Sequence, residues 1–234
     1  RGGLDASEQS HQLNEVVSIL GRAEGLTQQL LGFARMGKYQ PKLLDTNILL
    51  REAGLLLEKG FASTTSYTLK KNLHAKKHIH GDENQFHQII QNLAENAKDA
   101  MPTGGQITFA TEDVILKQQM IGFPSTIPTG EFVKISVSDN GIGIKDEDVE
   151  QIFDPFFTTK DIGMGTGLGL STLKGIVKNH GGYINVITQV SKGTTVDVFF
   201  PAIEPKPVEK TQKDTGDKNL KGKILFVDDE HDVR

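Results

Sequence analysis

Glycines at alternate positions are the sequence feature that most restricts the fold. Residues 163–169 read Gly-Met-Gly-Thr-Gly-Leu-Gly, and an apolar pattern typical of a helix begins directly after them. Glycine reaches backbone conformations that other residues avoid, so we expect a loop whose amides can hold phosphate at a helix N-terminus. The run does not fit the dinucleotide pattern G-x-G-x-x-G, because Leu168 and Leu170 stand where a third glycine is required.

The composition argues against several functional classes. The chain of 234 residues has no cysteine, which excludes disulfides, thiolate metal sites and a cysteine nucleophile and fits a reducing compartment. With 26 basic and 30 acidic side chains the net charge is −4, which gives no overall electrostatic case for binding nucleic acid or an anionic membrane. No apolar run approaches the ~18 residues of a spanning helix, and the first five residues do not resemble a signal peptide. We therefore expect a soluble, cytoplasmic stretch.

A seam of apolar side chains predicts a helix over Leu13–Ala34. Its positions advance in alternate steps of three and four, as in coiled coils and helix bundles: Leu13, Val16, Leu20, Ala23, Thr27, Leu30 and Ala34. Such a seam needs a partner, which is either a second helix of a hairpin or dimer or the chain's own domain. Gly37 and Pro41 end this helix.

Strand and helix patterns divide the remaining chain into one α/β domain and two attachments. After a short strand near Pro41, the patterns predict helices over 47–59, 83–101 and from 169, and strands over 66–73, 106–111, 132–138, 183–188 and 194–200. Asp82 can cap the second of these helices, with Gln85 at the capping-box position. Residues 203–221 have few apolar side chains and predict a linker, and residues 222–234 predict the first strand of a further domain.

Three polar side chains are expected on one face of the helix over 83–101. Asn92, Asn96 and Asp99 lie four and three residues apart, which places them together on a helix. Amides and a carboxylate facing inward are costly unless they meet a polar ligand or ion, and an amide oxygen suits Mg²⁺ that is held mainly by phosphates. A solvated polar face is the alternative.

Two further clusters follow the predicted strand over 132–138. In Asp139-Asn-Gly141-Ile-Gly143 the glycines allow close backbone approach, and the carboxylate could accept a hydrogen bond from an adenine amino group. A plain turn is the alternative. The second cluster, Phe153–Lys160, is aromatic, then polar, then basic, and directly precedes the glycine run.

The four clusters, in this order, resemble the ATP-binding domain of sensor histidine kinases. The resemblance covers about Leu43–Pro201, including Gly193-Thr194 as a last glycine box. It implies an α/β (α+β) sandwich, in which a mixed, mostly antiparallel sheet carries helices on one face. It further implies that residues 1–40 hold one helix of a dimerisation and phosphotransfer hairpin, that residues 41–202 are the kinase domain, and that residues 222–234 begin a receiver domain. These features resemble a hybrid kinase of the nitrogen-regulator-like branch.

The same resemblance assigns roles to residues of this chain. Asn96 would coordinate Mg²⁺, Asn92 would contact phosphate or the ion's waters, and Asp139 would bind the adenine amino group. The nucleotide-binding set that the resemblance implies is Asn92, Asn96, Asp99, Asp139, Gly141, Gly143, Lys160, Gly163, Gly165, Thr166, Gly167, Leu168, Gly169 and Thr194. Within this set, Lys160 and the loop over 163–169 would form a lid over the phosphates.

The phosphoacceptor histidine is expected outside this stretch, upstream of Arg1. His11 is followed by Gln-Leu-Asn-Glu rather than by the family's acidic and apolar pattern. We therefore expect no catalytic residue in this stretch and no self-phosphorylation by it alone. The implied partners are ATP, a receiver domain in the same or another chain, and a second copy that pairs through the N-terminal helix.

Two other functions remain open at this point. A gyrase- or mismatch-repair-like ATPase is supported by Asp99, which those relatives share. Such enzymes carry a glutamate general base one turn before the key asparagine, where this chain has Asn92. A non-catalytic nucleotide-binding module would be favoured by degraded motifs, and none of the motifs here is degraded.

Overall fold

The computed structural model describes residues 40–61, 67–123, 125–160 and 165–205. The elements in chain order are β1 (Lys42–Leu44), α2 (Thr46–Phe61), β2 (Tyr67–Leu73), β3 (Ile79–Gly81), α3 (Glu83–Asp99), β4 (Gly105–Leu116), β5 (Gly130–Asp139), α4 (Gly169–Asn179), β6 (Tyr183–Gln189) and β7 (Gly193–Pro201). The helix predicted over Leu13–Ala34, most of the predicted linker and the strand predicted near residue 224 lie outside the described residues. Of the linker predicted over 203–221, residues 203–205 are described, and Ile203 exchanges two backbone hydrogen bonds with His78 (2.9 and 2.8 Å), which attach it to the domain.

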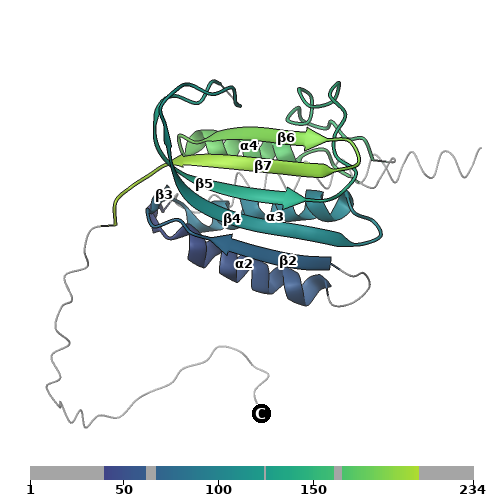
Figure 1. Cartoon of the computed structure of the whole chain (residues 1–234), viewed down its shortest axis with the longest axis horizontal. Helices are drawn as coiled ribbons and strands as arrows, with labels where there is room; N and C mark the ends of the chain where they lie inside the picture. Colours follow the sequence, from purple (N-terminus) through teal and green to yellow (C-terminus); the bar gives the residue numbers. More distant parts are fainter. Residues whose placement is uncertain (1–39, 62–66, 124, 161–164, 206–234) are drawn as a thin grey trace, which may run out of the picture. The chain divides into compact units, whose positions relative to one another are not determined.

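A five-stranded sheet in the order β2-β4-β5-β7-β6 forms the centre of the domain (Figure 1). β2 runs parallel to β4, whereas the pairs β4-β5, β5-β7 and β6-β7 are antiparallel. This arrangement confirms the predicted mixed, mostly antiparallel sheet. β1 and β3 form a separate two-stranded antiparallel sheet.

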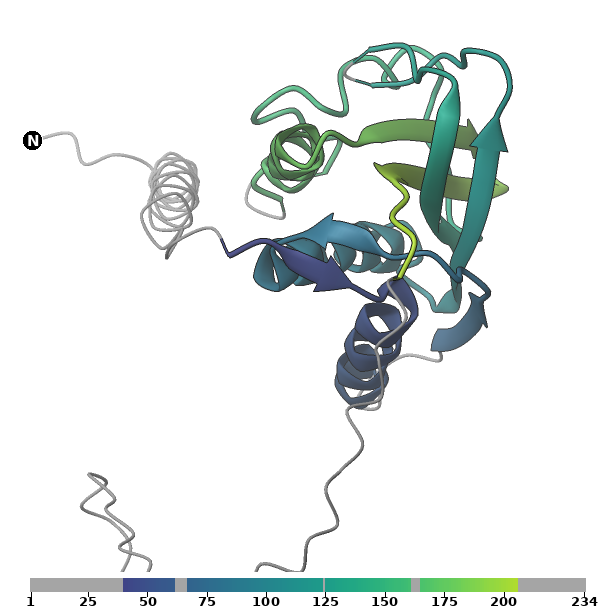
Figure 2. The same ribbon diagram turned by 90° about the vertical axis from the view of Figure 1, so that its left-hand side faces the viewer.

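The three helices cover one face of the sheet (Figures 1 and 2). α3 contributes a buried row to the core between the layers, formed by Phe86, Ile89, Ile90, Leu93, Ala94 and Ala97. Because side chains alternate along a strand, Val133 and Phe200 join this core while their neighbours Phe132 and Phe199 pack in a second cluster with Ile127. The fold predicted for the domain is therefore confirmed.

α3 begins as predicted, but only half of the expected capping box forms. The Asp82 side chain accepts hydrogen bonds from the backbone N–H groups of Asn84 (3.0 Å) and Gln85 (3.3 Å). The prediction of a reciprocal bond from the Gln85 side chain is wrong: the Asp82 backbone N–H donates to Nε2 of His180 at 3.2 Å. His180 caps the end of α4, so the start of α3 and the end of α4 are joined.

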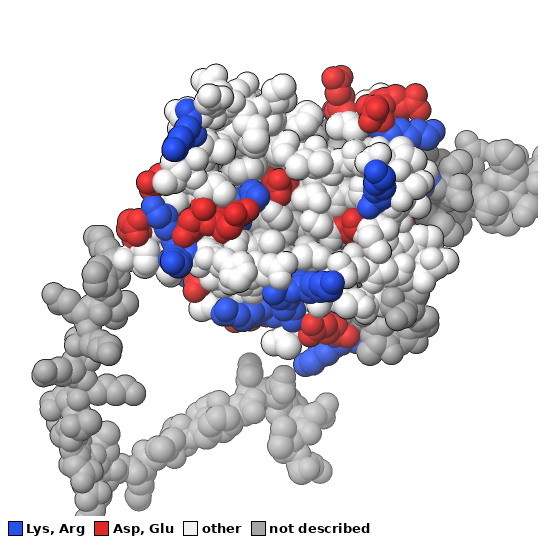
Figure 3. Space-filling model, viewed as in Figure 1, with Lys and Arg blue, Asp and Glu red and all other residues white. Residues whose placement is uncertain are grey.

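The hairpin of β4 and β5 extends further than its apolar alternation predicts. Glu112 and Asp113 interrupt the pattern, yet both lie in β4. Asp113 accepts the backbone N–H groups of Lys76 (2.9 Å) and Lys77 (3.1 Å), and Glu112 pairs with Lys134 across the ladder. Charged partners from neighbouring segments therefore support this end of the strand, and Figure 3 shows acidic and basic side chains interspersed over the sheet.

Candidate nucleotide-binding site

Asp139 lies at the end of β5, where two backbone amides fix its carboxylate. The N–H groups of Gly141 (2.8 Å) and Thr194 (3.2 Å) both donate to Oδ1. The structure thus brings together Asp139 and Thr194, which are 55 residues apart and which the resemblance places in the same nucleotide-binding set. Both bonds are made to Oδ1, and no donor in the described part of the chain is bonded to the second oxygen, Oδ2, which can therefore accept a donor on a ligand.

Burial raises the pKa of the Asp139 carboxyl above its ordinary value of 3.8, although the hydrogen bonds from Gly141 and Thr194 act in the opposite direction. A carboxylate taken out of water gains from any donor that a ligand supplies. The side chain is therefore suited to recognising an amino group.

The loop after Asp139 is held by bonds to the end of α3, to β6 and to the turn between β6 and β7. Ile142 donates its N–H to the carbonyl of Ala100 (3.0 Å), at the end of α3, and accepts the N–H of Ser191 (2.7 Å). Ile144 donates to Oγ1 of Thr188 in β6 at 2.9 Å. Gly143 has φ +71°, and a Cβ there would lie 2.2 Å from the carbonyl oxygen of Gln189. Glycine is therefore needed at this position for two reasons: other residues disfavour this backbone conformation, and there is no space for a Cβ.

Sequence reasoning did not identify two residues that build this loop. The sequence indicates only a turn at Asn140, but its Oδ1 accepts the N–H of Gln106 at 2.7 Å. Thr188 fits the pattern of an ordinary strand residue, but its hydroxyl also bonds to the Gly193 carbonyl (3.2 Å) and the Thr194 hydroxyl (3.0 Å). β6 also contains Asn185 and Gln189, so a polar side chain at Thr188 gave no distinguishing signal.

Asn92 and Asn96, the two asparagines of α3 that were predicted to lie in the site, differ in their hydrogen bonding. Nδ2 of Asn92 donates to the carbonyl of Gly169 at 3.0 Å, which connects α3 to the start of α4. Nδ2 of Asn96 is buried and has no hydrogen-bond partner within the described residues. A buried amide without a partner is costly, so Asn96 is a side chain for which a polar ligand or a hydrated ion would be favourable.

Asp99, the third of the polar side chains predicted to share one face of α3, forms an ion pair with Lys160. The two residues are 61 positions apart, and their side chains are 45% and 34% exposed. The structure therefore brings the end of the aromatic and basic cluster next to α3. It also gives Asp99 a partner that sequence reasoning did not identify.

Part of the glycine-rich segment is described, from Gly165 onward, and Gly163 lies outside the described residues. Phe156 donates its N–H to the carbonyl of Gly167 at 3.0 Å, and both residues have positive φ, +69° and +66°. α4 begins after Leu168 without a side-chain cap, so its first N–H groups are oriented toward any anion placed at that end. This geometry suits the predicted phosphate-binding loop.

A model of the histidine kinase-, DNA gyrase B- and HSP90-like ATPase family matches residues 81–204. The chain belongs to this family. It is 38% identical to sensor kinase CckA of Brucella abortus over 91% of this chain and 23% of that protein. The chain spans less than half of the length of the first curated relatives that it matches.

Solved structures agree with this placement. The catalytic domain of histidine kinase ThkA in a nucleotide-free form has a TM-score of 0.54 and 28% identity, over 69% of this chain and 97% of that domain. ThkA in complex with the response regulator protein TrrA has a TM-score of 0.60 at 23% identity, over 86% of this chain and 54% of the other. The resemblance to the ATP-binding domain of histidine kinases is confirmed. No helix among the described residues has the length and hydropathy needed to span a bilayer.

Proposed function

We propose that this chain binds Mg²⁺·ATP between α3, the loop after β5 and the start of α4, and transfers its γ-phosphoryl group to a histidine. The observation that carries the proposal is the fixed carboxylate of Asp139, which leaves one oxygen for an amino group. The buried Nδ2 of Asn96, which has no acceptor among the described residues, is the second support, because this donor can bond to a phosphate oxygen or to a water of a hydrated ion.

The adenine end of the site is Asp139 with Gly141, Gly143 and Thr194. Oδ2 of Asp139 accepts the exocyclic amino group of the base. Gly141 lets the loop pack against the end of α3, because a Cβ there would lie 2.5 Å from the carbonyl oxygen of Ala100. Thr194 keeps the carboxylate in place through its N–H. A guanine base presents a carbonyl oxygen at the corresponding position, which the carboxylate would repel, so this arrangement selects adenine.

The phosphate end is formed by α3 and by the segment that leads into α4. Asn96 would hold Mg²⁺ through its amide oxygen; Asn92, Lys160 and the N–H groups after Leu168 would face the phosphates. The ion, when bound, neutralises charge on the phosphate oxygens. Lys160 is paired with Asp99 in this structure, so its ammonium group must leave a carboxylate to reach a phosphate. The resemblance also includes Gly163, Gly165 and Thr166 in this part of the site.

The reaction is an in-line phosphoryl transfer. A histidine imidazole nitrogen forms a bond to the γ-phosphorus while the bond from that phosphorus to the bridging oxygen breaks, and ADP leaves. The chain's residues position the phosphates and stabilise their charge. Hydrolysis is disfavoured because the position used for a general base in gyrase-type ATPases is Asn92, whose amide nitrogen is bonded to Gly169.

The partners and the domain organisation follow the same proposal. Residues 1–40 would belong to a dimerisation hairpin and residues 222–234 to a receiver domain, separated from the kinase domain (41–202) by the linker 203–221. The apolar run over 224–227, followed by the acidic residues Asp228 and Asp229, is the sequence feature that supports the receiver. A response regulator would then be the final phosphoryl acceptor, and the use of ATP favours a cytoplasmic location for this domain.

Phosphotransfer to a supplied histidine tests the proposal. The chain is incubated with γ-labelled ATP and Mg²⁺, alone and with a two-helix hairpin that carries the phosphoacceptor. We expect acid-labile, base-stable label on the hairpin and no label on the chain alone or on a hairpin whose histidine is replaced by glutamine. Asp139→Asn should label the hairpin much less at low ATP concentration. Label on the chain alone that His11→Gln abolishes would contradict the assignment. Equal phosphate release with and without the hairpin would favour an ATPase.

A further inference from the structure

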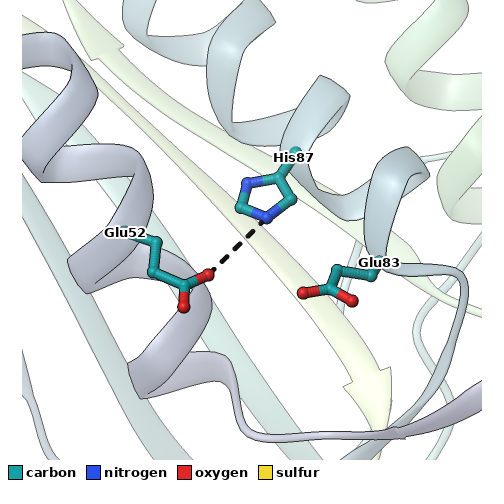
Figure 4. A group of neighbouring side chains, drawn as sticks. All are labelled: Glu52, Glu83 and His87. Carbon is teal, nitrogen blue, oxygen red and sulfur yellow. Dashed lines mark ion pairs between the residues drawn. The ribbon is translucent and has the colours of Figure 1, made fainter. Parts of the chain in front are cut away.

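Three ligand-type side chains converge on the outer side of α2 and α3, at a place that the nucleotide site does not use. Glu83 and His87 are one turn apart on α3, and Glu52 approaches from α2 (Figure 4). One ligand atom from each lies within 4.8 Å of the other two. Nε2 of His87 is 3.9 Å from Oε2 of Glu52, beyond the ~3.2 Å of a hydrogen bond.

We propose that Glu52, Glu83 and His87 form a binding site for a divalent transition-metal ion of the zinc class. One imidazole nitrogen and two carboxylates are a donor set that zinc accepts, with water as the fourth ligand. The imidazole disfavours Mg²⁺ and Ca²⁺, which prefer oxygen donors throughout. The spacing of four residues between Glu83 and His87 lets one helix supply two ligands from the same face.

The geometry requires only a small contraction. Donors of a tetrahedral zinc ion lie about 3.4 Å apart, given metal–ligand bonds near 2.1 Å. The Glu52 and Glu83 side chains are 52% and 38% exposed, so their rotamers can change without disturbing the core. His87 is 32% exposed and its ring is held between the two helices.

Lys42 is the competitor for this site. Its ammonium group pairs with the Glu83 carboxylate, and this hydrogen bond lowers the pKa of Glu83. To bind a metal ion, Glu83 must therefore exchange one cation for another. The ion pair is exposed, with Lys42 at 59%, so the exchange costs little.

The position of the site predicts a mechanical effect rather than a catalytic one. His87 and Asn96 are nine residues apart on α3, which places them on opposite sides of the helix at about 100° per residue. An ion at His87 would connect α2 to α3 from outside while Asn96 faces the nucleotide site. Metal binding should therefore raise the thermal midpoint of unfolding without replacing Mg²⁺ in the ATP site.

Zinc calorimetry on the chelator-treated full chain tests the proposal. We expect one saturable site in the micromolar range, weakened at least ~10-fold by His87→Ala, Glu52→Gln or Glu83→Gln, and tightened severalfold by Lys42→Met. His80→Ala, which removes an exposed histidine of β3 outside the group, is the matched control and should bind as the wild type does. Cobalt(II) bound at the same site should give the visible absorption of a four-coordinate ion, and His87→Ala should lose it.

Three results would overturn the inference: no saturable zinc binding by the wild type, equal binding by His87→Ala, or loss of binding in His80→Ala. Circular dichroism shows whether each variant is folded. We expect all of them to fold, because the substitutions lie at partly exposed positions. A variant that unfolds can be replaced by His87→Gln, which preserves the size of the side chain and removes the imidazole donor.

Discussion

Replacing Gly143 by alanine should destabilise the domain through two separate costs. The residue has φ +71°, and a Cβ there would lie 2.2 Å from the Gln189 carbonyl oxygen. A left-handed conformation costs a non-glycine residue about 1–2 kcal/mol. Relief of the overlap requires the loop to move away from β6, which breaks the bonds Ser191 N–H to Ile142 (2.7 Å) and Ile144 N–H to Thr188 (2.9 Å). Each bond contributes about 0.5–1.5 kcal/mol.

The expected loss for Gly143→Ala is therefore about 2–5 kcal/mol, a large part of the ~5–15 kcal/mol of a typical domain. Two matched glycines separate the contributions. Gly181 has φ +64°, and no atom lies within 4 Å of the position that its Cβ would take, so Gly181→Ala should lose only about 1–2 kcal/mol. Gly175 lies inside α4 with open space around it, and Gly175→Ala should gain about 1 kcal/mol.

Urea denaturation followed by circular dichroism measures the three variants, with the m-value as the check that the same surface unfolds. The predicted order of stability is Gly175→Ala, wild type, Gly181→Ala, Gly143→Ala. A Gly143→Ala variant within about 0.5 kcal/mol of the wild type, or one that loses no more than Gly181→Ala, would refute the reasoning.

Two predictions concern the proposed nucleotide site. Burial raises the pKa of Asp139 above 3.8, and the ionised form accepts the amino group, so affinity for adenosine should begin to fall on acidification at a pH above 3.8. Titration calorimetry should show no such fall for Asp139→Asn. Identical pH profiles for the wild type and this variant would contradict the role of Asp139. Lys160→Met should lower the affinity for ATP about tenfold and leave the affinity for adenosine unchanged. The thermal midpoint of unfolding should change little, because the ion pair with Asp99 is exposed. An equal loss of affinity for both ligands would place Lys160 away from the phosphates.

The order of the elements was predictable because each one has a local cause. α3 shows this most clearly, since its apolar row and its cap at Asp82 both lie within one stretch of sequence. The position of Asp139 was predictable for the same reason: a short apolar strand ends at an acidic residue followed by two spaced glycines. In each case the residues that form the pattern lie close in the chain to the residues whose structure the pattern determines.

Contacts between distant segments were not predictable from spacing. His180 accepts the N–H of Asp82 from 98 residues away, where Gln85 was expected to cap. Asn92 bonds to Gly169 and Lys160 pairs with Asp99 across 77 and 61 residues. Several side chains satisfy the same local pattern. The packing of α3 against α4 decides which of them bonds to the backbone groups of Asp82 and Gly169.

Affinity for a non-hydrolysable ATP analogue with Mg²⁺, measured by calorimetry on Asp139→Asn, tests the central claim most directly. The amides of Gly141 and Thr194 hold Oδ1, so the new side-chain NH₂ would face the amino group of adenine. Loss of this charged hydrogen bond should cost about 1.5–3 kcal/mol, or roughly ten- to a hundredfold in affinity. Asp113→Asn is the matched control, because Asp113 also accepts two backbone N–H groups but lies in β4 near Lys76 and Lys77. The account predicts weakened binding for Asp139→Asn alone; wild-type affinity in a folded Asp139→Asn variant would contradict it.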